Sequence, residues 1–82
     1  MSRIIVYGAD WCGDCLRAKR FLDQHSVLYE WIDIEVDPRA GTKVRELNRG
    51  RRIIPTIVFD DGSVLIEPTN SQLAAKFGIH EG

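Results

Sequence analysis

The sequence has no long hydrophobic run and no excess of charge of one sign. Its apolar stretches are four residues long or shorter, whereas a membrane-spanning helix needs roughly 20. The formal net charge of -1 gives no field that would attract nucleic acid or an anionic membrane. No basic stretch followed by an apolar segment opens the chain, so we expect no signal peptide and a cytoplasmic protein. The 82 residues are enough for one domain, residues 1–82, and too few for two.

Cysteine and histidine are scarce, with two of each. Cys12 and Cys15 lie three positions apart, so a disulfide between them would close almost no loop and would add little stability. A cytoplasm would also keep a structural pair reduced. Structural zinc needs about four ligands, and His25 and His80 do not have finger-like spacing. We therefore predict no metal site and a pair of reactive thiols.

Periodicity and turn residues predict three helices and four strands. The helices show apolar residues every three or four positions, and the strands are short β-branched runs. Asp37-Pro38 is typical of a helix start and Gly50 of the end of that helix, while Thr69 opens a capping-box pattern and Gly78 ends the last helix. The predicted elements are a strand at 3–7, a helix at 13–25, a strand at 28–34, a helix at 38–49, a hairpin of strands at 56–59 and 63–66, and a helix at 70–77.

The order of these elements, β-α-β-α-β-β-α, defines the expected topology. A strand, a crossover helix and a second strand form a parallel pair. The strands around Asp60-Asp61-Gly62 form an antiparallel hairpin. We therefore predict an α/β fold with a four-stranded mixed sheet flanked by helices, the last of which covers one face.

The motif Trp11-Cys12-Gly13-Asp14-Cys15 lies between the first strand and the first helix. Cys12 then stands near a helix N-terminus, whose free N–H groups and dipole favour a thiolate. Cys15 lies one turn later on the same side and can reach the sulfur of Cys12. This spacing predicts dithiol chemistry, in which Cys12 attacks a disulfide and Cys15 releases the mixed disulfide.

Charged residues accompany this motif. Three cations follow the motif and add positive potential: Arg17, Lys19 and Arg20. The Asp14 carboxylate between the cysteines opposes them, so the sequence leaves open whether the surrounding charge favours a thiolate at Cys12. A second acidic group follows the second strand and is interpreted as solvated loop charges: Asp33, Glu35 and Asp37.

Four features together resemble the glutaredoxins, and among them the mycoredoxin-like dithiol branch. They span essentially the whole chain in the order that the family uses. A CxxC motif followed about forty residues later by a proline-threonine pair is more specific than either piece alone. The features are the Trp11–Cys15 motif after a strand, the Ile53-Ile54-Pro55-Thr56 segment, the Asp60-Asp61-Gly62-Ser63 hairpin and the Pro68-Thr69-Asn70-Ser71 entry to the last helix.

The resemblance implies a thioredoxin/glutaredoxin fold with a cis proline at Pro55 beside the cysteines. It implies that Ile54 offers backbone groups to a bound thiol or peptide. It also implies that Arg51 or Arg52 binds a carboxylate of the thiol, unless these arginines form only a solvated turn. Trp11 would be an apolar platform or simply a partly buried aromatic. The implied binding set, including the N-terminus of the last helix, is Trp11, Gly13, Asp14, Arg52, Ile54, Pro55, Thr69 and Asn70, with Ser71 beside them.

Two departures from the family pattern concern the electron donor. Gly13 and Asp14 stand where glutaredoxins commonly carry proline and an aromatic residue, and Glu67-Pro68 replaces a double glycine. Glu67 would repel an anionic thiol. The resemblance implies glutathione or mycothiol as the co-substrate, and these departures argue against glutathione. They leave mycothiol, another low-molecular-weight thiol or a thioredoxin-reductase-like enzyme as the expected electron source.

The resemblance implies a thiol–disulfide oxidoreductase that reduces mixed disulfides or protein disulfides, with no tightly bound cofactor. A function of another class is an iron–sulfur cluster carrier bridged between two protomers, because Gly13 relaxes the turn after Cys12. We expect a monomer that binds neither nucleic acid nor membrane.

Overall fold

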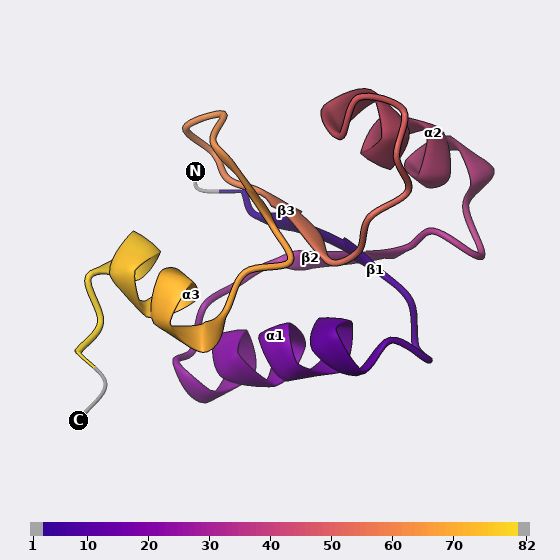
Figure 1. Cartoon of the computed structure of the whole chain (residues 1–82). Helices are drawn as coiled ribbons and strands as arrows, with labels where there is room; N and C mark the ends of the chain where they lie inside the picture. Colours follow the sequence, from indigo (N-terminus) through magenta and orange to yellow (C-terminus); the bar gives the residue numbers. More distant parts are fainter. Residues whose placement is uncertain (1–2, 81–82) are drawn as a thin grey trace.

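A computed structural model describes residues 3–80. Seven elements follow one another in the predicted order (Figure 1). Their bounds are β1 Ile5–Gly8, α1 Gly13–Gln24, β2 Glu30–Asp33, α2 Pro38–Leu47, β3 Thr56–Val58, β4 Val64–Ile66 and α3 Asn70–Phe77.

The four strands form one mixed sheet in the order β2-β1-β3-β4. Strands β1 and β2 are parallel, as the crossover through α1 predicted, while β3 is antiparallel to both β1 and β4. The hairpin of β3 and β4 is also confirmed. This is the predicted fold class.

The helices lie on both faces of the sheet, with α1 and α3 on one side and α2 on the other (Figure 1). Two separate hydrophobic clusters correspond to these layers. The larger one joins α1 and α3 to the sheet through residues such as Val6, Leu22 and Leu73, all fully buried. The smaller one joins α2 to the sheet through Tyr7, Ile34, Ala40 and Val44. Helix α3 therefore covers one face, as expected.

The C-terminal end of α2 differs from the prediction. The helix ends at Leu47 with Asn48 as its C-cap, and Arg49, not Gly50, is the first residue beyond it. Arg49 and Gly50 both have positive φ, at 56° and 88°. The Gly50 N–H donates to the Arg45 carbonyl at 2.6 Å, the hydrogen bond that characterises a Schellman ending. Gly50 therefore takes part in the helix ending as the second residue after the C-cap Asn48.

The register of the sheet determines which loops meet. Gly8 at the end of β1 is paired with Asp33 at the end of β2, and Tyr7 is paired with Thr56 at the start of β3. Thr56 is in turn paired with Ile66 at the end of β4. The loops after β1, β2 and β4 and the segment before β3 therefore share one edge of the sheet, and the cysteine motif lies there.

Candidate active site

Cys12 is the N-cap of α1. Its sulfur accepts a hydrogen bond from the Cys15 backbone N–H at 3.2 Å, and its backbone N–H donates to the Ala9 carbonyl at 3.1 Å. The side chain is half-buried. The Cys12 sulfur therefore lies at the N-terminus of α1 and receives a backbone N–H of its first turn.

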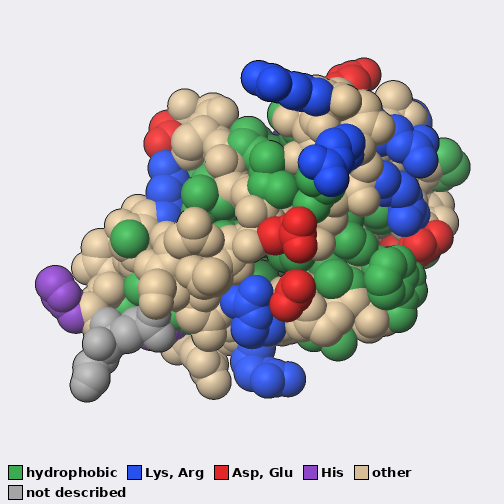
Figure 2. Space-filling model, viewed as in Figure 1, with side chains coloured by type: hydrophobic (Ala, Val, Ile, Leu, Met, Phe, Trp, Pro, Cys, Tyr) green, Lys and Arg blue, Asp and Glu red, His purple; other side chains and the backbone are tan. Residues whose placement is uncertain are grey.

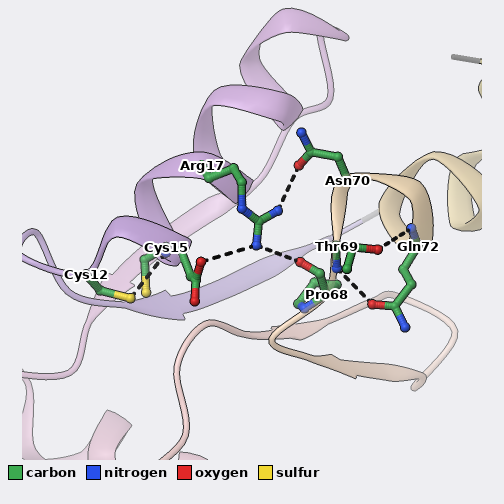
Figure 3. A network of polar contacts seen from close by, with 8 residues as sticks. Cys12, Cys15, Arg17, Pro68, Thr69, Asn70 and Gln72 are labelled. Atoms are coloured by element: carbon green, nitrogen blue, oxygen red, sulfur yellow. Dashed lines mark hydrogen bonds and ion pairs between the residues drawn. The ribbon is translucent and has the colours of Figure 1, made fainter. Parts of the chain in front are cut away.

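Cys15 is fully buried one turn further along α1, and its sulfur lies next to that of Cys12 (Figure 3). The pKa of the Cys15 thiol is raised to about 12, first by burial and then by hydrogen bonding to Cys12. A backbone hydrogen bond involving Ala9 acts in the opposite direction. Cys15 is therefore a thiol at neutral pH, whereas Cys12 is the accessible sulfur.

Gly8 allows Cys15 to approach the sheet closely. A Cβ atom at this position would lie 3.0 Å from the Cys15 Sγ and 2.7 Å from the Cη2 atom of Trp31. The indole of Trp31 is held in turn by the Lys19 ammonium, 4.6 Å from the ring centroid. The end of β1 thus needs glycine because a buried sulfur and a rigid ring occupy the space of a side chain.

Arg17 connects the motif to α3 (Figure 3). Its guanidinium donates to the Asn70 Oδ1 at 2.9 Å and to the Pro68 carbonyl at 3.1 Å. The same group lies 3.6 Å from the Asp14 carboxylate. Arg17 therefore places a positive charge against Asp14 and fixes the distance between α1 and the start of α3.

The N-terminus of α3 is closed by a capping box. The Thr69 hydroxyl accepts the Gln72 N–H at 3.1 Å, and the Gln72 side chain accepts the Thr69 N–H at 2.8 Å. The first N–H groups of a helix have no partner within it. The capping box uses those of Thr69 and Gln72, so the N–H groups of Asn70 and Ser71 are left for other acceptors.

A cis peptide bond joins Ile54 to Pro55, as the resemblance implied. Pro55 is fully buried and directly precedes β3, at the same edge of the sheet as the cysteine motif. Its carbonyl accepts the Glu67 N–H at 2.8 Å. Because Pro68 follows Glu67 and bonds to Arg17, a short series of hydrogen bonds connects the cis proline to α1.

Glu35 joins two residues of the predicted binding set. Its Oε1 atom accepts a hydrogen bond from the Trp11 indole at 3.3 Å and lies 3.1 Å from the Arg52 Nη2. Trp11 is 67% exposed, so it is not a partly buried aromatic, and its role as a platform stays a prediction. Glu35 is an exposed turn residue, as predicted, and the parallel pairing of β1 and β2 also brings its carboxylate to the cysteine loop.

The other two acidic residues of this stretch also have structural partners. The Asp33 carboxylate accepts the Glu35 N–H at 2.8 Å. Asp37 caps α2 by accepting the Arg39 N–H at 3.0 Å. These contacts add a structural role to the predicted loop charges, except that Asp33 is the last residue of β2 and not a loop residue.

The structure gathers most of the predicted set at one edge of the sheet. Arg51 is exposed and Gly13 has open space where a Cβ would stand. Ile54 packs on the smaller hydrophobic cluster. Sequence analysis missed the roles of Glu35 and Arg17. For Glu35 a signal existed, since it follows a strand predicted to lie parallel to the one before Cys12.

Within residues 3–80, no three His, Cys, Asp or Glu side chains are grouped so that they could hold a metal ion. None of the helices in that range is long and apolar enough to cross a membrane.

Comparison with known proteins identifies the family. The Glutaredoxin family model matches residues 4–64. A protein of Mycobacterium tuberculosis that bears the glutaredoxin name is 38% identical over 75 residues, covering 92% of this chain and 89% of its own. Mycoredoxin 1 of Corynebacterium glutamicum is 36% identical over 76 residues, covering 93% of this chain and 94% of its own.

Solved structures agree with this assignment. The glutaredoxin of Archaeoglobus fulgidus superposes with a TM-score of 0.76 at 25% identity, covering 92% of this chain and 85% of that one. The crystal structure of a thioredoxin-like protein has the same TM-score at 29% identity, with 88% and 96% covered. The chain therefore belongs to the glutaredoxin family and is a thiol–disulfide oxidoreductase.

Proposed function

We propose that Cys12 is the attacking thiol and Cys15 the resolving thiol of this oxidoreductase. The Cys12 thiolate attacks one sulfur of a substrate disulfide and forms a mixed disulfide, while the other sulfur leaves as a thiolate. Cys15 then loses its proton and attacks the Cys12 sulfur. This closes the Cys12–Cys15 disulfide and releases the substrate, so two electrons pass from the dithiol to the substrate.

This proposal rests on the different surroundings of the two sulfurs, one accessible and one buried. Cys12 is reachable and receives a backbone N–H, whereas burial raises the pKa of Cys15 to about 12 and keeps it a thiol. The nearby charge of Cys12 also contributes to raising the pKa of Cys15. Once Cys12 is part of a mixed disulfide, that charge is gone, and Cys15 loses its proton more readily when it is needed.

We propose a low-molecular-weight thiol as the electron donor, with its carboxylate bound by Arg52 and by the N–H groups of Asn70 and Ser71. The Arg52 side chain is 34% exposed and, among residues 3–80, forms an ion pair with Glu35 alone, and a helix N-terminus attracts anions. Glutathione carries carboxylates that suit this site, whereas mycothiol carries none, so an adduct with mycothiol would count against the carboxylate role of Arg52 and Asn70. Trp11 beside Cys12 and Ile54 before the cis proline would contact the bound thiol or peptide. We place this activity in the cytoplasm, in a monomer.

The test uses the Cys15→Ser variant, which stops the reaction at the mixed disulfide. The variant is treated with glutathione disulfide or with mycothiol disulfide, and the adduct is measured by intact mass. We expect rapid adduct formation with one of the two and none with Cys12→Ser. If neither thiol adds while a thioredoxin reductase still reduces the wild-type disulfide, the donor is the reductase, and the roles of Arg52 and Asn70 are wrong.

A further inference from the structure

Positive charge is concentrated in residues 38–52, which comprise α2 and the loop that follows it. This segment contains six of the eleven Lys and Arg residues but one of the twelve Asp and Glu residues. Figure 2 shows Lys and Arg side chains gathered over α2 and this loop, in the upper right of the view. The net charge of -1 therefore averages a basic region and an acidic remainder, so it understates the local field.

Most of these cations have no partner within the described part of the chain. We define the basic surface as Lys43, Arg45, Arg49 and Arg51, which are all exposed and form no ion pair within residues 3–80. The buried side of α2 is formed by other residues, among them Ala40 and Val44. Packing therefore does not require these four charges, and neighbouring like charges repel one another.

The basic surface borders the redox site. Arg51 is followed by Arg52, whose guanidinium lies 3.1 Å from the Glu35 carboxylate. That carboxylate also accepts the indole N–H of Trp11 at 3.3 Å, and Trp11 is adjacent to Cys12. A partner seated on the basic surface would therefore reach the accessible sulfur from the side of Trp11.

We infer that the basic surface docks the acidic surface of a protein that exchanges its disulfide with Cys12, an inference that rests on the proposed function. Exposed charges of complementary sign raise association rates and orient an encounter. A protein fits better than nucleic acid because the surface borders the redox site, and Cys12 exchanges with a disulfide, a group that a protein can carry and nucleic acid lacks.

The test uses two synthetic peptides that differ only in charge. Each has one cysteine blocked as a mixed disulfide with 2-mercaptoethanol, flanked by four Glu residues in one peptide and four Gln residues in the other. The rate constant for attack by the Cys15→Ser variant is measured at low and high salt. We expect the Glu peptide to react about 10-fold faster at low ionic strength. The difference should vanish near 1 M salt, where the Debye length is about 3 Å.

Variants locate the effect on the surface. The triple change Lys43→Gln/Arg45→Gln/Arg49→Gln should abolish the preference for the Glu peptide and leave the rate with the Gln peptide unchanged. A matched pair of single changes serves as the control. Arg45→Gln should lower the rate with the Glu peptide. Arg20→Gln, an equal loss of charge at an exposed position of α1 on the other side of the sheet, should lower it much less.

The outcomes separate the inference from the proposed function. Equal rates for the two peptides with Cys15→Ser, or equal effects of Arg45→Gln and Arg20→Gln, would overturn the inference alone. Failure of both peptides to react would overturn the proposed function and the inference with it. A labelled DNA duplex that displaces the Glu peptide from wild-type protein would reassign the surface to nucleic acid and overturn the inference.

Discussion

Glu35 is expected to compete with an anionic co-substrate for Arg52. The two side chains are 3.1 Å apart and are 48% and 34% exposed, so their pairing is screened and contributes roughly 0.2–1 kcal/mol. Because 1.4 kcal/mol corresponds to a factor of about ten, releasing Arg52 should strengthen its interaction with a bound carboxylate by about 1.4- to 5-fold. Glu35→Gln removes the charge and keeps an oxygen for the Trp11 indole.

The assay compares two small disulfides of similar size. Dithiodiglycolate carries carboxylates, and bis(2-hydroxyethyl) disulfide is neutral. In the Cys15→Ser background, Glu35→Gln should raise the rate constant for the first and leave the second unchanged. Arg52→Gln should remove this gain in a double-mutant cycle. An equal change for both disulfides, or a gain that persists without Arg52, would refute the competition.

Three further predictions concern stability and thiol reactivity. Gly8→Ala should lower the free energy of unfolding by about 1–3 kcal/mol through overpacking. Gly13→Ala should not lower it, because no atom lies within 4 Å of the added Cβ. Urea unfolding of the two variants and the wild type measures the difference. Hydrogen bonds, first that from Ser63, lower the pKa of Asp61 below 3.8, so the stability gap between wild type and Asp61→Asn should be full above pH 5 and shrink on acidification. Iodoacetamide at pH 8 should leave Cys15 unmodified in peptide mass mapping, because the pKa of this thiol is about 12.

Local signals in the sequence were sufficient for the fold. The capping box at Thr69, the Asp37-Pro38 helix start and the hairpin turn each act over a few residues, and all three are present. The end of α2 was placed less accurately, because Arg49 adopts a positive φ of 56° that its residue type does not favour. The glycine therefore stands one residue later in this ending than the sequence pattern predicts.

The site was predictable only where its chemistry is local. Cys12 and Cys15 lie one helical turn apart, so their spacing in the sequence was enough to predict them as a pair. Glu35 and Arg52 lie 17 positions apart, and their contact depends on the position of the loop after β2 relative to the segment before β3. Charge alone could not reveal this pairing, because the same residues suit a solvated loop equally well.

Arg17 shows why a count of nearby charges left the balance around Cys12 open. Counted along the sequence, it is one of three cations that follow Asp14. In the structure it lies 3.6 Å from the Asp14 carboxylate and also donates to Asn70 and to the Pro68 carbonyl. The Arg17 guanidinium therefore offsets the charge of Asp14. It also holds the N-terminus of α3, which we propose binds the thiol. The charge of Asp14 is compatible with dithiol chemistry here because the fold supplies its counter-charge from the next turn of the same helix.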